Sequence, residues 1–177
     1  METKLKRQMA ESIRGFRLPR YAEIPTVGLY LEQTIKYINS YLAPLGCLEL
    51  TGSMVSNYVK KGYIENPIRK QYDAKQIAYL IVIAIIKNVV SMEHSARLFA
   101  MQKQVYSVET AYDYFCCELE NMLFFTFGLK DEVDAIGTSN TELKRMLRSV
   151  IIAVANIIYV QHSFETIVLE DAAQEAE

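Results

Sequence analysis

Apolar residues recur at helical spacing along much of the chain, and this pattern predicts a succession of α helices. The first helix spans about 29–43 and ends at Pro44. Its apolar positions follow one another at intervals of three or four: Leu31, Ile35, Ile38 and Leu42. A second helix of about three turns begins after Thr51, a favourable N-cap, and stops at Gly62. Two helices joined by a short connector are therefore expected in the first third of the chain.

The most apolar stretch predicts the central helix of a core. Asp73 is a good N-cap, and from there to about Val90 the helix is apolar on nearly every side. Ser91 opens a further helix, and Ser107 opens another that ends at Gly128. The latter helix has an apolar stripe with spacings of four and three: Val108, Tyr112, Phe115, Leu119 and Met122.

The last predicted helix follows an acidic loop and runs over about 140–165. Ser139 and Glu142 have the spacing of a capping box at its start. Its apolar stripe contains Leu143, Leu147, Val150, Val154 and Ile157. The two chain ends lack this helical spacing of apolar residues. We expect residues 1–17 to form a loosely ordered, flexible arm and the acidic tail, 169–177, to be disordered.

Charge is divided unevenly along this pattern. The whole chain has a formal net charge of −2. Residues 1–106 contain 15 Lys and Arg against 8 Asp and Glu, a balance of +7, and residues 107–177 contain 4 against 13, a balance of −9. A basic front half and an acidic back half are expected where one part of a protein meets a polyanion and the other has a different role. The alternative is solvated surface charge without a function.

The helix after Thr51 separates its residue types into two faces. Met54, Val55 and Val59 form an apolar face. The other face and the segment that follows carry hydrogen-bonding side chains and cations, which are the types that meet base edges and phosphates in DNA. The candidate base contacts are Ser53, Ser56, Asn57 and Lys60. The candidate contacts to the DNA backbone are Lys61, Arg69, Lys70 and Tyr72.

The order of features from Leu50 to Phe99 is similar to the DNA-binding domain of the MerR regulators, in which a helix-turn-helix precedes a wing and two further helices. The segment YDAKQIAYLIVIAIIKNVVSMEHSARLF resembles the tyrosine, acidic cap, helix, connector and final helix of that family. Tyr58 and Gly62 keep the family's residue types in the recognition helix, and the resemblance thereby adds Tyr58 to the candidate DNA contacts. Ser56 stands where the family has an arginine. Residues 65–71 are too few for the family's two-stranded wing, so a short loop is expected there.

Taken whole, the sequence resembles an uncharacterised bacterial family known as domain of unknown function 1836. Members of that family carry, in this order, an arm with LPR, an element like SMVSNYVKKGYI and an apolar helix like AYLIVIAIIK. The resemblance extends from about Phe16 to Ile158. What it implies is a predicted regulator.

Other kinds of site find little support in the sequence. His94 and His162 stand alone, and no phosphate-binding glycine loop, HExxH or paired-carboxylate motif appears. Cys116 and Cys117 have no further ligand at metal-binding spacing, so we interpret the three cysteines as reduced core thiols. We therefore expect no enzymatic activity, no cofactor and no metal. The two stretches that could be membrane spans contain ten and sixteen uncharged residues, fewer than the ~20 that a span needs. A cytoplasmic protein without a signal peptide is therefore expected.

These patterns together predict a mostly all-α protein with four parts. They are a flexible arm at 1–17, a MerR-like winged helix-turn-helix domain at 18–104, a helical C-terminal part at 105–168 and an acidic tail at 169–177. The expected function is a DNA-binding transcriptional regulator that docks the 51–61 helix in the major groove of double-stranded DNA. The alternative is a helical protein-interaction module without DNA binding.

The C-terminal helices leave two questions open. The helices at 107–127 and 140–165 form either a homodimer surface, since helix-turn-helix proteins commonly bind as dimers, or the layer that closes the core around the central helix. Their aromatic residues either line an effector pocket or simply fill the core. These residues are Tyr112, Tyr114, Phe115, Phe124, Phe125 and Phe127.

Overall fold

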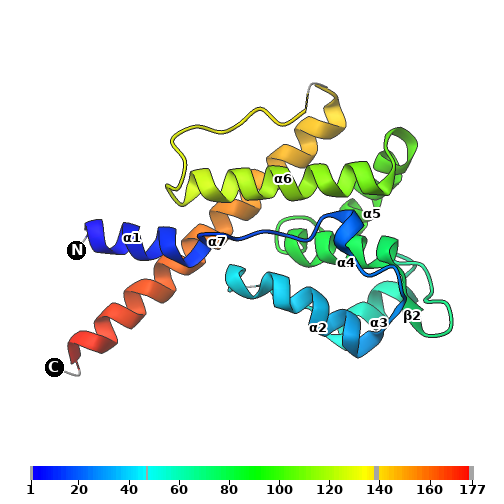
Figure 1. Ribbon diagram of the computed structural model, residues 1–177, viewed down its shortest axis with the longest axis horizontal. Coiled ribbons are helices and arrows are strands. Elements are labelled where there is room, and N and C mark those ends of the chain that lie inside the picture. The colour runs from blue at the N-terminus through cyan, green and yellow to red at the C-terminus, as the bar shows by residue number, and fades with distance from the viewer. Residues whose placement is uncertain (1, 47, 138–139, 176–177) are drawn as a thin grey trace.

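The structure, a computed structural model, describes residues 2–46, 48–137 and 140–175, which form a helical protein (Figure 1). The α helices of this part of the chain are α1 Glu2–Ile13, α2 Leu31–Leu42, α3 Gly52–Lys60, α4 Ala74–Ile86, α5 Met92–Val105, α6 Val108–Thr126 and α7 Glu142–Glu175. The short 3-10 helices η1 and η2 span Tyr21–Glu23 and Ala43–Leu45. Strands β1 Leu29–Tyr30 and β2 Gln71–Tyr72 pair antiparallel. The predicted, mostly all-α architecture is confirmed.

Helix α4 lies at the centre of the core, as its sequence predicts. Its residues are buried on nearly every side from Gln76 to Ile86, and α2, α5, α6 and α7 pack around it. Asp73 Oδ1 accepts a hydrogen bond from Gln76 N at 2.8 Å, and Gln76 Oε1 accepts one from Asp73 N at 2.9 Å. This capping box fixes the start of the helix. The helix ends at Ile86, earlier than the predicted Val90.

Side-chain caps set the starts of α3, α5 and α6, and a glycine sets the end of α3. Thr51, Ser91 and Ser107 each accept a hydrogen bond from the backbone N–H three residues further on. At the other end of α3, Gly62 has a φ of 75°, a left-handed conformation that glycine adopts without a steric penalty. The three predicted starts and the predicted stop are therefore confirmed.

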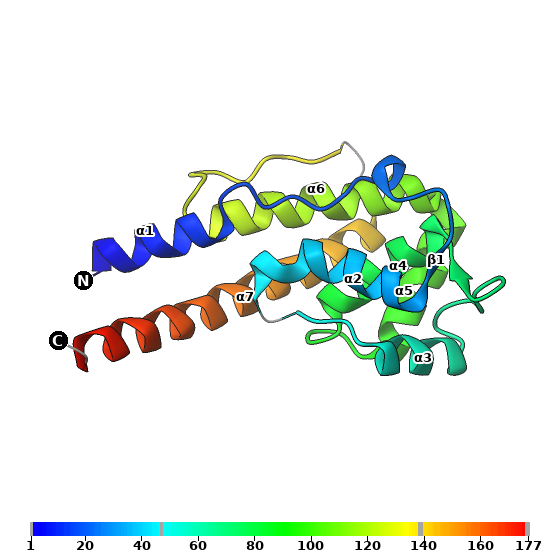
Figure 2. The same cartoon turned by 60° about the horizontal axis from the view of Figure 1, so that its bottom comes forward.

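The two chain ends are more ordered than the sequence suggests. Residues 2–13 form α1 instead of a loosely ordered arm, because Met9 and Ile13 are buried where α1 packs on α7 and α6. Helix α7 continues to Glu175, so residues 169–175 are helical and not disordered as predicted. The ends of α1 and α7 project together from one side of the molecule, at the opposite end from α3 (Figure 2).

At the start of α7, the predicted capping residue Ser139 lies outside the described residues. Thr141 Oγ1 accepts a hydrogen bond from Lys144 N at 3.3 Å and caps the helix there.

Helices α6 and α7 pack on each other and close the core around α4. The stripe residues Tyr112, Phe115, Leu119 and Met122 are buried in α6, and Val154 of the α7 stripe is buried as well. The α6 stripe thus faces the interior of the chain, and the α7 stripe is partly buried against it through Leu147, Val150 and Val154. None of the described helices combines the length and the apolar character that crossing a bilayer requires.

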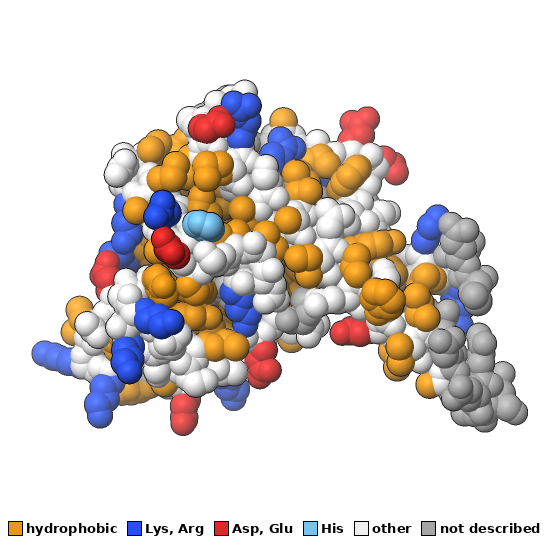
Figure 3. All heavy atoms as spheres, turned by 180° about the vertical axis from the view of Figure 1, so that it is seen from behind, with side chains coloured by type: hydrophobic (Ala, Val, Ile, Leu, Met, Phe, Trp, Pro, Cys, Tyr) orange, Lys and Arg blue, Asp and Glu red, His pale blue; other side chains and the backbone are white. Residues whose placement is uncertain are grey.

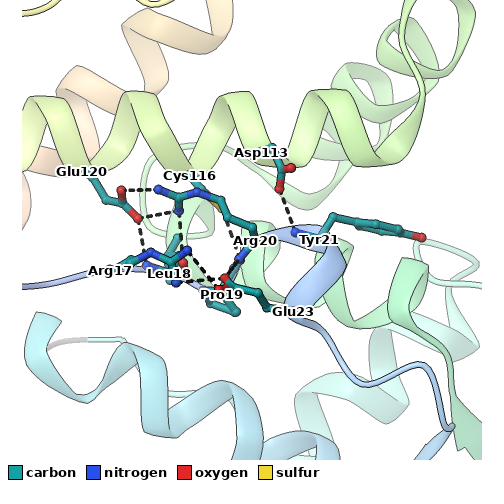
Figure 4. Close-up of polar contacts among 9 residues, drawn as sticks. All are labelled: Arg17, Leu18, Pro19, Arg20, Tyr21, Glu23, Asp113, Cys116 and Glu120. Carbon is teal, nitrogen blue, oxygen red and sulfur yellow. Dashed lines mark hydrogen bonds and ion pairs between the residues drawn. The ribbon is translucent and has the colours of Figure 1, made fainter.

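Between α1 and β1, the chain runs along α6 as an extended segment (Figure 4). Tyr21 N donates to Asp113 Oδ1 at 2.7 Å, and Cys116 Sγ donates to Pro19 O at 3.8 Å. Leu18, which belongs to this segment, is fully buried. The LPR residues, Leu18 to Arg20, therefore connect the front of the chain to α6.

Candidate nucleic-acid interface

Helix α3 packs one face on the core and exposes the other. Val55 is fully buried, and Met54 and Val59 are partly buried against the core, as the sequence predicts. The exposed face carries Ser53, Ser56, Asn57 and Lys60. Because these residues are three or four positions apart, they share one side of a helix of nine residues, about 13 Å long.

The entry into α3 is held by Asn39 of α2. Its Oδ1 accepts a hydrogen bond from Leu50 N, and its Nδ2 donates one to Leu50 O, both at 2.9 Å. Leu50 itself is fully buried, so the start of α3 is fixed relative to α2. The connection between the two helices, residues 43–51, is longer than the turn of about four residues found in helix-turn-helix motifs.

A tight turn after α3 presents two cations at its tip. Gln71 N donates to Ile68 O at 2.9 Å, and Ile68 N donates to Gln71 O at 3.1 Å. Arg69 and Lys70 between them have φ values of 52° and 64°. Two successive positive φ values are the feature of type I′ turns, where Asn and Gly are favoured. Side chains with a Cβ are strained there by about 1 kcal/mol each.

Strand β2 anchors this turn to the rest of the domain. Tyr72 pairs with Leu29, and Gln71 pairs with Tyr30, in the strand that leads directly into α2. The segment predicted as a short loop is thus a turn with a fixed position next to α3.

Four cations of this region are exposed and have no carboxylate partner among the described residues: Lys60, Lys61, Arg69 and Lys70. We call them the basic face. Other cations of the described chain do pair with a carboxylate, among them Arg14, Arg17, Arg20, Lys75, Arg97, Lys130, Arg145 and Arg148. Lys and Arg side chains gather at the end of the molecule that carries α3 (Figure 3). The C-terminal helices leave the basic face uncovered.

The one acidic residue between Leu50 and Tyr72 is neutralised locally. Glu65 Oε1 lies 2.8 Å from Lys75 Nζ, and this ammonium group lowers the pKa of Glu65 below its ordinary value. Gln76 Nε2 also donates to Glu65 O at 2.9 Å and holds the backbone in place. The basic face is therefore not offset by a free carboxylate in its own segment.

Two predicted DNA contacts are core residues instead. Tyr58 and Tyr72 are only 6% and 5% exposed, and burial raises the pKa of both hydroxyls. Tyr58 lies three positions after Val55, so its helical spacing already places it on the buried side of α3. Tyr72 is positioned by the pairing of β2 with β1.

The remaining reactive side chains form no recognisable site. Among the described residues, no group of three or more His, Cys, Asp or Glu is placed to hold a metal ion. Cys116 is buried, which raises the pKa of its thiol to about 12, Cys117 is partly exposed, and Cys47 lies outside the described residues. Nδ1 of His162 lies 3.0 Å from Ser12 Oγ, a contact between α1 and α7 that sequence spacing does not reveal.

Comparison with known protein families gives one match. The family model described as Domain of unknown function (DUF1836) matches residues 19–115, which is more than half of the 177 residues. The match starts within the LPR arm and ends in α6, so it is shorter than the expected resemblance from Phe16 to Ile158. Comparison with curated proteins and with solved structures gives no significant match, and none of the three comparisons shows a MerR-like helix-turn-helix.

Proposed function

The chain belongs to the DUF1836 family, and we propose that it is a DNA-binding regulator that places α3 in the major groove and the 68–71 turn against the adjacent DNA backbone. The observation that carries the proposal is the basic face. Its four exposed cations have no carboxylate partner in the described chain, and two consecutive elements present them. Cations in this state attract phosphates and release the counterions bound to them.

The exposed face of α3 suits the chemistry of the major groove. That groove is about 12 Å wide and admits one α helix. Asn57 can pair with the edge of adenine through its amide, and Ser53 and Ser56 can bond to several bases. This face carries no arginine, which is the usual partner of guanine. Most of the affinity should therefore come from phosphate contacts, with modest discrimination between sequences.

A fluorescence-anisotropy titration with mixed duplex DNA at several salt concentrations tests the proposal. If each of the four cations contacts one phosphate, the logarithm of the binding constant should fall with the logarithm of salt with a slope of about −3 to −4 per protomer. Replacing Lys60 and Lys61 together by Ala should weaken binding and make the slope shallower by about two. The double variant Arg69→Ala with Lys70→Ala should have the same effect.

A control variant separates this effect from a general loss of charge. Arg145→Ala removes an exposed cation of α7 that pairs with Glu142 at 2.7 Å, and DNA binding should not change. No binding at low salt, or equal binding by the control and the basic-face variants, would refute the DNA-binding proposal.

The second candidate, a helical interaction module, is favoured by the outer side of α7. Val160, Phe164 and Val168 are 49%, 65% and 64% exposed and follow one another at intervals of four residues. They form an apolar stripe distinct from the predicted one, which faces the core. Two copies of the chain could bury this stripe around a two-fold axis, and the dimer would then carry two basic faces. This is a narrower form of the predicted homodimer, in which α6 takes no part.

Sedimentation velocity tests this self-association. The wild-type protein should sediment as a dimer and the Phe164→Glu variant as a monomer, because a carboxylate in the centre of an apolar contact must be desolvated. Arg145→Glu, which also adds a negative charge to α7 but lies outside the stripe, should remain dimeric. A wild-type protein that sediments as a monomer at all concentrations would contradict the dimer.

A further inference from the structure

A second feature of the molecule lies away from the basic face. Helices α4, α5, α6 and α7 line a partly open cavity of about 230 Å³. Val82, Leu98, Ala111 and Leu147, one from each helix, line it, and most of its surface is apolar. Tyr112, Tyr114 and Phe115 line it too, whereas the other aromatic residues that the sequence offered for a pocket, Phe124, Phe125 and Phe127, do not.

The size of the cavity sets the size of what can fill it. An apolar cavity of about 150 Å³ accommodates a benzene molecule. By proportion, this cavity accommodates an apolar group of roughly nine non-hydrogen atoms. A ring system of one or two rings or a branched aliphatic chain has this size.

One cation stands at the lining of the cavity. Of the described residues that line the cavity, Lys144 alone has a charged side chain. Its Nζ donates to Ile136 O at 2.6 Å and lies 5.0 Å from the centre of the Tyr114 ring. An ammonium group has three donors, so hydrogen-bonding capacity remains for a ligand. The nearby buried Glu118 forms its ion pair with Arg148, whose Nε lies 2.9 Å from Glu118 Oε1.

The ring that faces this cation belongs to Tyr114, which also carries a neutral donor. The hydroxyl of Tyr114 is buried and has no hydrogen-bond partner among the described residues. Burial raises the pKa of Tyr114 to about 12, so the hydroxyl keeps its proton at neutral pH. A buried hydroxyl without a partner is unfavourable, and a ligand that accepts its hydrogen bond removes that penalty.

We propose that this cavity binds a small carboxylic acid whose aromatic or branched aliphatic body fills the apolar part and whose carboxylate meets Lys144 and the Tyr114 hydroxyl. A carboxylate supplies both an anionic partner for Lys144 and an acceptor for the hydroxyl of Tyr114. The inference goes beyond the proposed function, since the cavity can bind such an acid whether or not the protein binds DNA.

The cavity also has a structural connection to α3. The rings of Tyr79 and Phe99, with centres 4.7 Å apart, line it on one side. The same two residues line a second cavity of about 160 Å³, whose other walls include Gly62 and Glu65, directly after α3. These two rings therefore form a wall shared by the ligand cavity and the segment that ends the candidate recognition helix.

Titration with 2-naphthoate, followed by the fluorescence of the ligand, tests the proposal without DNA. The protein has no tryptophan, so its own emission interferes little. We expect a dissociation constant between about 10 μM and 1 mM, the range for a ligand of this size. The neutral isostere 2-naphthamide should bind about tenfold more weakly, because it lacks the charge-assisted hydrogen bond.

Two variants assign the binding to this cavity. Lys144→Met should remove the preference for the carboxylate over the amide, and Ala111→Leu should weaken both ligands by filling the apolar part. Thermal unfolding of each variant shows whether it is folded, and Leu147→Phe replaces Ala111→Leu if the latter is not. Absence of 2-naphthoate binding up to about 5 mM, equal binding of acid and amide by the wild type, or no effect of the filling variant would overturn the proposal.

Discussion

Arg20 and Glu120 form a two-pronged ion pair that joins the extended arm to α6 (Figure 4). The distance from Arg20 Nη1 to Glu120 Oε1 is 2.7 Å, and that from Nη2 to Oε2 is 2.6 Å. Glu120 Oε1 also accepts a hydrogen bond from Leu18 N at 2.9 Å. The planar guanidinium matches the carboxylate in geometry, and this makes such pairs stronger than single contacts. One carboxylate thus holds both the side chain and the backbone of the LPR arm.

Glu120→Ala should destabilise the protein. The side chains of Arg20 and Glu120 are 23% and 12% exposed, so removing the carboxylate leaves a largely desolvated cation and an unpaired backbone N–H. We expect the free energy of unfolding in urea to fall by about 2 kcal/mol, somewhat less than for a fully buried pair. The matched control is Arg17→Ala, which breaks an exposed pair with Glu23. This substitution should lower the free energy of unfolding by less than about 1 kcal/mol. Equal losses would show that Glu120 does not secure the arm.

The 68–71 turn should gain stability and lose DNA affinity when its tip is replaced. Arg69→Asn with Lys70→Gly introduces the residue types that positive φ values favour, and the free energy of unfolding should rise by about 1 kcal/mol. DNA binding should weaken because two phosphate contacts are lost.

The control for this turn keeps the strain and removes only the charge. Arg69→Gln with Lys70→Gln should weaken DNA binding to the same degree while leaving the stability near that of the wild type. If both double variants are equally stable, the positive φ values cost little. If neither weakens DNA binding, the turn does not touch DNA.

Glu118 should make stability depend on pH. Its side chain is 1% exposed, and burial raises its pKa above the ordinary value of 4.5, although Arg148 and Lys144 oppose the shift. Because the folded protein binds this proton more tightly than the unfolded chain does, the free energy of unfolding should fall as the pH rises through the raised pKa. Below the ordinary value, where both states are protonated, the full contribution is present.

Glu118→Gln removes this titration. The variant should be more stable than the wild type at pH 7, by about 1.4 kcal/mol for each unit by which the pKa is raised, and the gap should close towards pH 4. Denaturant unfolding at several pH values measures it, with the exposed Glu132→Gln as a variant whose profile should follow the wild type. A gap that does not change with pH would mean that the pKa of Glu118 is the same in the folded protein and in the unfolded chain.

Helix α1 should contribute to the stability of the whole chain. Met9 is 2% exposed, and Met9→Ala should lower the free energy of unfolding by about 2–3 kcal/mol by leaving a cavity between α1 and α7. Gln8→Ala, at an exposed position of the same helix, should change it little. If both substitutions have no effect, residues 2–13 do not take part in cooperative folding.

The parts of the fold that depend on neighbouring residues were predictable. Thr51, Asp73, Ser91 and Ser107 cap their helices through bonds to residues three positions away, so the sequence contains the whole interaction. Helix α1 was missed because the apolar surface that orders it belongs to α7, about 150 residues later in the chain.

In the candidate site too, some features follow from the local sequence and others depend on residues far apart in the chain. The exposure of Lys60 and Lys61 follows from the helical period of α3, and the same period could have identified Tyr58 as buried. The position of Arg69 and Lys70 depends on the pairing of β2 with β1, which brings together residues about 40 positions apart in the sequence. The cavity could not be predicted at all, since four helices leave it between them only when they pack.

If both proposals hold, the wall formed by Tyr79 and Phe99 lies between the ligand cavity and the segment that follows α3. A carboxylic acid that moves either ring, and DNA that moves the segment Gly62–Glu65, would then each change the affinity for the other. Linkage then requires reciprocity: the factor by which a bound carboxylic acid changes the dissociation constant of DNA must equal the factor by which DNA changes that of the acid. One measurement of the acid's affinity with and without saturating DNA therefore gives the size and the sign of the regulation.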